Sequence, residues 1–290
     1  MMRLLPAVLC LPLVACVVGD AGTGPTGDDD DQTQDPGGNN GEHPDPPLDP
    51  PAGDPARIST DTTWSGTVAV DVITTIDAGV TLTVSPGTTI NMKSGTQIKV
   101  EGIMDVQGTS AEKVTIAATV PTQPHAGISV LSGGQLTLSY VVQSGGGIHT
   151  TSGATATIRD STFSNPGGPS SRGDFLVMGG GTLDMQYSEI GLSAGDGTHC
   201  NLHFGGQNNT ITIMNSTIRG VPYGLMLYGG QNANLSNNNW DNPIDIDTQP
   251  GVSANIEGSY FKRGAPTAQG GAQFTGIPSE TERTDALPRP

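Results

Sequence analysis

The chain has 290 residues and a formal net charge of −16, yet only 14% of its residues are charged. That fraction is well below the ~25% usual for globular domains. The charge is uneven: residues 19–56 carry ten acidic and no basic side chains, whereas residues 57–265 carry fifteen acidic and nine basic ones. With four lysines in the whole chain and no basic stripe, nucleic-acid binding is not expected.

The first residues have the features of an export signal. Residues 1–15 combine a basic start at Arg3 with an apolar run too short to span a membrane as a stable helix. The following Leu13-Val-Ala-Cys16 resembles the lipobox of bacterial lipoproteins. This resemblance implies cleavage before Cys16, acylation of Cys16 and, since Val17 follows, anchoring at the outer membrane of a Gram-negative cell. The domain is expected at the cell surface. The alternative is an ordinary signal peptide in which Cys16 is incidental.

Residues 16–56 are rich in Asp, Pro and Gly, including the run Asp28-Asp-Asp-Asp31. Such a segment has almost no apolar surface to bury and is expected to be a disordered tether. The tether would hold the following domain away from the membrane.

From residue 127 onward the chain repeats one unit six times. Its first copy is Gly127-Ile-Ser-Val-Leu-Ser-Gly-Gly134, and successive copies start 20, 27, 27, 23 and 19 residues apart when six apolar positions are aligned: Ile128, Ile148, Phe175, Leu202, Leu225 and Ile244. Each copy is followed by a pair of apolar residues two apart, such as Leu136 and Leu138, and five copies then have a further apolar residue, such as Phe163. This pattern predicts a solenoid with three short strands per unit.

The predicted turn between the second and third strands has its own pattern. It contains Asp160, Tyr187, Asn215, Asn237 and Gly258, of which only Tyr187 is not a residue type that tolerates a left-handed backbone. The next residue in each copy is small and polar: Ser161, Ser188, Ser216, Asn238 and Ser259. These five side chains are predicted to point inward and form a hydrogen-bonded ladder.

The segments Ala78-Gly-Val-Thr-Leu-Thr-Val-Ser-Pro-Gly-Thr-Thr-Ile90 and Ile98-Lys-Val-Glu-Gly-Ile-Met-Asp-Val-Gln-Gly-Thr109 resemble the opening of secreted β-helix proteins of the pectate-lyase-like superfamily. The resemblance implies an all-β, right-handed parallel β-helix of about nine three-strand coils over residues 57–277. Residues around Trp64 and residues 262–277 are expected to cover its two ends. Residues 278–290 are expected to be a disordered tail.

The superfamily includes lyases, hydrolases, adhesins and scaffolds, so function must come from the outward side chains. Alternation from the aligned positions predicts a binding patch on one sheet face, for a polysaccharide or an envelope or extracellular protein: His149, Leu176, Met178, His203, Met226 and Tyr228. The alternative is that long loops bury this patch. Other outward rows, such as Thr137, Thr157 and Thr212, are expected to be solvated, although they could hydrogen-bond sugars.

Catalysis by this chain is not expected. The carboxylates Asp241, Asp245 and Asp247 are close in sequence, but no Lys or Arg takes the equivalent outward position of the adjacent coil. The Asn-Thr-Asp and Gly-His-Gly motifs of polygalacturonase-like members are also absent. The alternative is a polysaccharide lyase or glycoside hydrolase that uses these three carboxylates.

No metal or cofactor is expected, because His199, Cys200 and His203 lack an evident fourth ligand. The sequence thus predicts a lipoprotein, attached to the membrane through its lipid anchor, whose non-catalytic β-helix serves binding, adhesion or scaffolding at the cell envelope.

Overall fold

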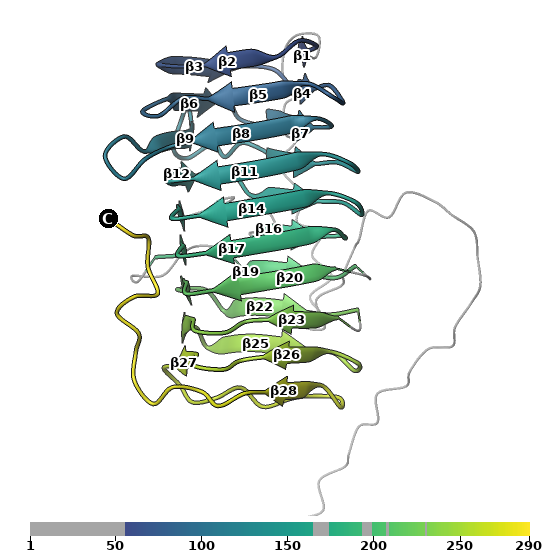
Figure 1. Ribbon diagram of the computed structural model, residues 1–290, viewed down its shortest axis with the longest axis vertical. Coiled ribbons are helices and arrows are strands. Elements are labelled where there is room, and N and C mark those ends of the chain that lie inside the picture. Colours follow the sequence, from purple (N-terminus) through teal and green to yellow (C-terminus); the bar gives the residue numbers. More distant parts are fainter. Residues whose placement is uncertain (1–55, 165–173, 193–198, 207–208, 230) are drawn as a thin grey trace, which may run out of the picture. The chain divides into compact units, whose positions relative to one another are not determined.

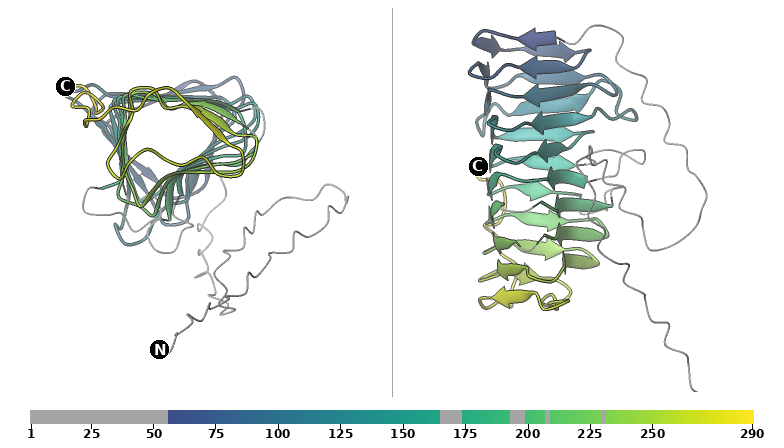
Figure 2. Two further views of the ribbon diagram at one scale, coloured as in Figure 1. Left: turned by 90° about the horizontal axis from the view of Figure 1, so that it is seen from below. Right: turned by 90° about the vertical axis from the view of Figure 1, so that its right-hand side faces the viewer.

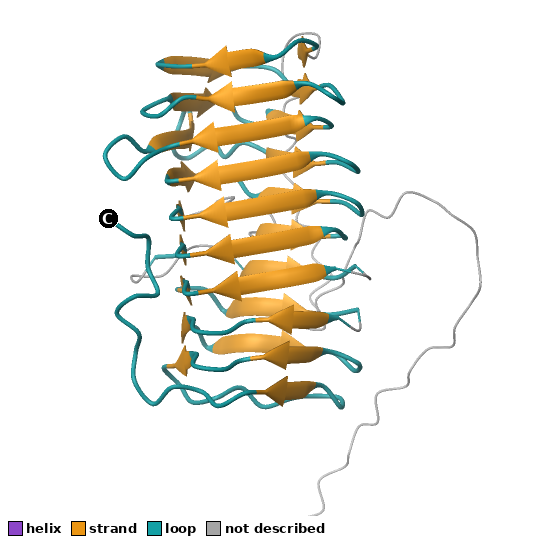
Figure 3. Ribbon diagram, viewed as in Figure 1, coloured by secondary structure: helices purple, strands orange, loops and turns teal. Residues whose placement is uncertain are grey.

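The protein forms three parallel β-sheets. The computed structural model describes residues 56–164, 174–192, 199–206, 209–229 and 231–290. These residues contain no α-helix (Figure 3), and hence none that is long and apolar enough to cross a membrane. The chain visits the three sheets in turn and returns to each one strand further along (Figure 1). The prediction of an all-β parallel β-helix of about nine turns is therefore confirmed.

The strands of each sheet pair in register with the strands of the coils before and after. The first sheet, called sheet A, contains in order β1 (Ala56–Ile58), β4 (Thr74–Ile76), β7 (Gln97–Val100), β10 (Gly127–Val130), β13 (Ile148–Thr150), β16 (Asp174–Met178), β19 (Cys200–Phe204), β22 (Tyr223–Leu227) and β25 (Ile244–Thr248).

Sheet B contains β2 (Thr62–Trp64), β5 (Thr81–Val84), β8 (Ile103–Gln107), β11 (Gln135–Ser139), β14 (Thr155–Arg159), β17 (Thr182–Gln186), β20 (Thr210–Met214), β23 (Asn232–Asn234), β26 (Ser253–Asn255) and β28 (Gln273–Thr275). Sheet C contains β3 (Thr67–Val70), β6 (Thr89–Met92), β9 (Val114–Ala118), β12 (Val141–Ser144), β15 (Thr162–Ser164), β18 (Glu189–Ile190), β21 (Thr217–Arg219), β24 (Asn239–Asp241) and β27 (Tyr260–Phe261).

The three sheets enclose a space along the axis of the solenoid (Figure 2, left). The buried hydrophobic side chains of the core fill it. Alternate residues of each strand point inward, and equivalent positions stack along the axis. Ile98, Ile128 and Ile148 form one such stack through sheet A, and each is fully buried. Burial of each of these side chains stabilises the fold by about 1.5–3 kcal/mol. Because every coil repeats the stack, the core is continuous along the solenoid.

The turn between sheets B and C uses a left-handed backbone in five consecutive coils. Tyr140, Asp160, Tyr187, Asn215 and Asn237 have φ between 49° and 59°. The expectation that Tyr187 does not fit this turn is wrong, since its φ is 51°. A left-handed conformation in such a residue costs on the order of 1–3 kcal/mol, and the sheets on both sides of the turn impose it.

The polar ladder beside this turn is confirmed. Ser161, Ser188, Ser216, Asn238 and Ser259 are all fully buried. Each one from Ser188 on accepts a hydrogen bond from the backbone N–H of its equivalent in the preceding coil, at 2.9–3.3 Å. The ladder therefore satisfies backbone donors that the corner would otherwise leave unpaired in the core.

Both ends of the solenoid carry partly buried hydrophobic side chains. Ile58 and Trp64 pack on the core in the first coil, and Phe274 packs on it in the last. Phe274 lies on β28, which pairs with β26 and covers its edge. The prediction that residues near Trp64 and residues 262–277 cover the ends is therefore confirmed.

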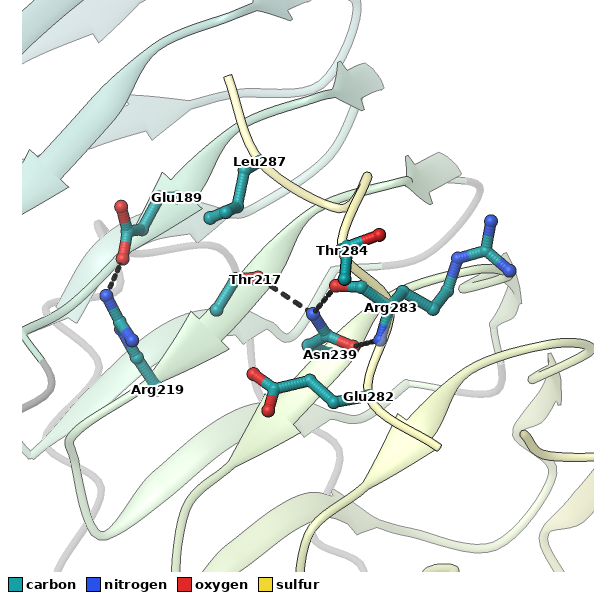
Figure 4. Close-up of a pocket in the computed structure, with 8 residues that line it drawn as sticks. All are labelled: Glu189, Thr217, Arg219, Asn239, Glu282, Arg283, Thr284 and Leu287. Carbon is teal, nitrogen blue, oxygen red and sulfur yellow. Dashed lines mark hydrogen bonds and ion pairs between the residues drawn. The ribbon is translucent and has the colours of Figure 1, made fainter. Parts of the chain in front are cut away.

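Residues 278–290 do not form the predicted disordered tail. They run back along the outside of sheet C as an extended segment, here called the strap, and end beside the middle coils (Figure 1). The backbone of Arg283 exchanges two hydrogen bonds with the Asn239 side chain, at 2.8 and 2.9 Å (Figure 4). Further along, the Thr217 hydroxyl donates to the carbonyl of Ala286, which is fully buried. The sequence did not predict these contacts, because the strap is polar and binds polar side chains, and so has no apolar pattern to indicate that it packs.

The last contact of the strap is its strongest. The backbone N–H, Nε and Nη2 of Arg289 donate to the carboxylate of Asp160 at 3.0, 2.8 and 2.7 Å. The guanidinium also lies over the Tyr187 ring, 4.1 Å from its centroid. The left-handed turn residues Asp160 and Tyr187 thus form the seat for the end of the chain.

Candidate functional site

The outer face of sheet A gathers acidic, histidine and tyrosine side chains over four adjacent strands. Two outward rows cross β16, β19, β22 and β25 in register. The first row is Asp174, Cys200, Tyr223 and Ile244, and the second is Val177, His203, Met226 and Asp247. At ~4.8 Å between strands, four strands span about 14 Å, the length of a short ligand.

The side chains that point outward in β16 and β25 are not the ones that the sequence alignment predicts. In each of these four strands the second and third residues are both buried, as Phe175 and Leu176 are in β16. The strict alternation of inward and outward side chains therefore fails at the start of each strand. The true equivalent of Ile148 is therefore Leu176, not Phe175, and the equivalent of Leu225 is Ile246, not Ile244. A shift by one residue moves side chains to the opposite face of the sheet.

This shift changes the predicted patch. Leu176 and Met178 are fully buried core residues, so their assignment to an outward patch is wrong. His203, Met226 and Tyr228 are partly exposed and His149 is exposed, all with outward positions. The surface is therefore mixed: Val177, Met226 and Ile244 are apolar, and acidic, histidine and tyrosine side chains lie among them.

Asp174 is the centre of one half of the site. Its Oδ2 lies 3.0 Å from Nδ1 of His203, and its Oδ1 lies 3.6 Å from Nδ1 of His199. The Asp174 side chain is only 10% exposed, and Oδ1 has no hydrogen-bond partner among the described residues. A buried carboxylate oxygen without a donor is costly, and Oδ1 of Asp174 is such an atom.

Tyr228 and Asp247 form the other half. The Tyr228 hydroxyl donates to Oδ2 of Asp247 at 2.5 Å, and burial together with this charged partner raises the pKa of Tyr228. The Tyr228 ring stands edge-on to His203, with centroids 5.6 Å apart. The rings of Tyr223 and His199 are 5.1 Å apart in a tilted arrangement. Tyr228 contacts Asp247 and His203, and His203 contacts Asp174, so the two carboxylates belong to one continuous surface.

Cys200 lies below this surface and is not reactive in this state. Its thiol is fully buried and donates to the Leu202 carbonyl at 2.8 Å. Burial is the main cause that raises the pKa of the thiol, and the charge of Asp174 adds to it. A thiol held in its protonated form is a poor nucleophile and a poor metal ligand.

The three carboxylates of the enzyme alternative lie in different environments. Asp241 is on β24 of sheet C and pairs with Lys262 at 2.5 Å. Asp245 is buried on β25 of sheet A, where its Oδ1 accepts from the backbone and side-chain amides of Asn242. Burial raises the pKa of Asp245 to about 6. Of the three, only Asp247 lies on the face that carries His203 and Tyr228.

Sequence reasoning missed Asp174, His199 and Tyr223 as parts of this site. Asp174 and Tyr223 stand at the first position of their strands, one and two residues before the aligned positions Phe175 and Leu225. Their shared register with Cys200 is the signal that could have found them.

A hollow lies between the strap and sheet C (Figure 4). It has a volume of about 410 Å³ and is lined in part by Glu189, Arg219, Glu282 and Leu287. Glu189 and Arg219 form an ion pair with each other, and Thr217 and Asn239 bond to the strap. Most of its polar groups are thus already paired within the protein.

The fold and the two outward rows define an all-β protein of the parallel β-helix class with a polar and aromatic face on sheet A. Among the described residues, no group of three His, Cys, Asp or Glu side chains is arranged to hold a metal ion. Comparisons with protein-family models, with curated proteins and with solved structures find no match to this chain.

Proposed function

We propose that the protein is a cell-envelope lipoprotein whose β-helix binds a hydroxyl-rich ligand, a glycan, on the outer face of sheet A. The observation that carries this proposal is the set of Asp174, His203, Tyr228 and Asp247 in adjacent coils. Carboxylate and imidazole acceptors beside aromatic rings suit a sugar, whose hydroxyls donate hydrogen bonds and whose C–H faces pack on rings.

Binding can be tested on a glycan array with the full chain in which Cys16 is replaced by Ser to keep it soluble. The wild-type face is expected to retain one group of glycans. Tyr228→Ala removes a ring and a hydroxyl at once and should abolish retention. Asp105→Ala, on the outer face of sheet B, is the matched control. Retention that survives Tyr228→Ala would contradict the assignment to sheet A.

Attachment to the outer membrane rests on the lipobox-like Leu13-Val-Ala-Cys16, which lies outside the described residues. A lipid chain on Cys16 and the acidic tether after it would present the β-helix beyond the membrane. Cys16→Ser should move the protein from the detergent-rich phase to the aqueous phase. An unchanged partition would contradict acylation.

Glycan cleavage is the second candidate, favoured by the contact of Asp247 with Tyr228, whose ring in turn contacts His203. A carboxylate or an imidazole oriented by Asp174 can act as a general base. Release of reducing or unsaturated ends from a retained glycan, lost in Asp247→Asn but kept in Asp241→Asn, would support catalysis. Intact glycan after prolonged incubation supports pure binding.

A further inference from the structure

Resting on the proposed function, we infer that the face on sheet A selects glycans that carry free, protonated amines, that is, amino sugars without N-acetyl groups. Three features of the described residues point to this class: the available hydrogen-bonding groups accept, the local charge is negative, and aromatic rings stand beside both carboxylates.

The first feature is the balance of donors and acceptors. Asp174 uses Oδ2 on His203 and leaves Oδ1 buried without a hydrogen-bond donor among the described residues. Because ionised carboxylates only accept, Nδ1 of His203 carries the proton in this contact, and in the neutral ring Nε2 is then an acceptor. The Tyr228 proton is committed to Asp247, which leaves the phenol oxygen able to accept. A ligand that contacts Nε2 of His203 or the phenol oxygen of Tyr228 must therefore supply hydrogen atoms.

The second feature is charge. Among the described residues, the only ion-pair partners of Asp174 are His199 and His203, and Asp247 has no ion-pair partner. By contrast, Asp184 on sheet B pairs with Arg159, and Asp241 on sheet C pairs with Lys262. The carboxylates of sheet A thus keep their negative charge for an external partner. A uronate would be repelled here, and an ammonium group would be attracted.

The third feature separates an ammonium from a neutral hydroxyl. Tyr228 is bonded through its hydroxyl to Asp247, and the Tyr223 ring lies 5.1 Å from the ring of His199, which contacts Asp174. Aromatic rings attract cations by about 0.5–2 kcal/mol. An ammonium supplies three donors together with a charge, whereas a hydroxyl supplies one donor and no charge. A primary amine on a sugar ring therefore matches all three features.

The experiment compares three oligosaccharides of equal length by titration calorimetry: oligomers of glucosamine, of N-acetylglucosamine and of galacturonate. The protein is the full chain with Cys16→Ser. The glucosamine oligomer should bind at least about tenfold more tightly than its acetylated counterpart. Galacturonate should not bind. Affinity for the glucosamine oligomer should fall as salt rises, because a charge pair on a surface is screened.

Two variants locate the effect. Asp174→Asn and Asp247→Asn keep side-chain size but remove one charge each, and each should weaken glucosamine binding about tenfold and reduce the preference over the acetylated oligomer. Asp105→Asn removes the same charge from sheet B and should change nothing. Thermal unfolding of each variant confirms that the fold is intact.

The failures are distinguishable. Equal or tighter binding of the acetylated or galacturonate oligomer overturns the amine preference but leaves glycan binding on sheet A in place. A loss in Asp105→Asn as large as in Asp174→Asn overturns the site, because the attraction then reflects the overall charge of the protein. Binding of none of the three overturns this inference, and a blank glycan array in addition overturns the proposed function.

Discussion

Replacing Arg289 by Ala should release the strap from sheet C while the β-helix stays folded. Arg289 donates three hydrogen bonds to Asp160, whose side chain is only 2% exposed, and two of them come from the guanidinium. Hydrogen bonds to charged groups contribute about 1.5–3 kcal/mol each when well shielded. The Arg289 side chain is half exposed, so we expect a loss of about 2 kcal/mol, a roughly 30-fold increase in strap opening.

Amide hydrogen exchange measures this opening directly. The Arg283 and Ser279 amides, which bond to Asn239 and to the Ser259 carbonyl, should lose protection in Arg289→Ala, whereas core strands such as β14 keep theirs. Arg263→Ala, an exposed arginine outside the strap, is the control. Unchanged exchange at Arg283 and Ser279 would refute the reasoning.

The same contact has a defined pH dependence. Burial alone would raise the pKa of Asp160, but hydrogen bonds from the Arg289 side chain and backbone, with the charges of Arg289 and Arg159, lower it below its ordinary value. The stabilisation is therefore present above the pKa of about 4 of an unfolded-state aspartate and is lost as the pH falls through the lower folded-state value. Asp160→Asn, which tolerates the left-handed turn, should open the strap at neutral pH.

Three further predictions concern the body. His125 is buried, and burial lowers its pKa to about 4. The contribution of the neutral ring to the free energy of unfolding should therefore be complete above pH ~6.5 and should fall by about 3 kcal/mol as the pH drops toward 4. Urea titrations over this pH range measure the loss. The pKa of Asp245 is raised to about 6, so its charged form is disfavoured in the fold. Asp245→Asn keeps the acceptor for Asn242 and should raise Tm more at pH 8 than at pH 4. A lower Tm at pH 8 would show that the charge stabilises the fold. Asn238→Ala breaks the buried ladder and should cost about 2–4 kcal/mol, whereas a cost below 1 kcal/mol would show that water replaces the amide.

Most of the architecture could be predicted from the sequence, because each coil of a solenoid repeats the same sequence pattern. The spacing of Ile128 and Ile148, the paired apolar residues and the small polar residue after each turn recur in successive coils, and each recurrence supports the others. The ladder from Ser161 to Ser259 followed from the same repetition.

The details that failed depend on contacts that no repeat encodes. Two consecutive inward residues at Phe175 and Leu176 shift the phase of β16, and this placed Leu176 and Met178 on the wrong face. The strap is polar in composition, so only its specific partners, Asn239 and Asp160, show that it docks. Tyr187 takes a left-handed turn because the neighbouring coils hold that position, against its own preference.

The most direct test of binding at sheet A is the response of the histidine ring signals in NMR spectra during titration with the glucosamine oligomer. His199 and His203 lie on the face, and His125 is buried away from solvent and serves as an internal reference. The account predicts saturable shifts of the His199 and His203 signals, lost in Tyr228→Ala, with the His125 signal unchanged. Saturable binding that leaves the His199 and His203 signals unmoved would contradict it.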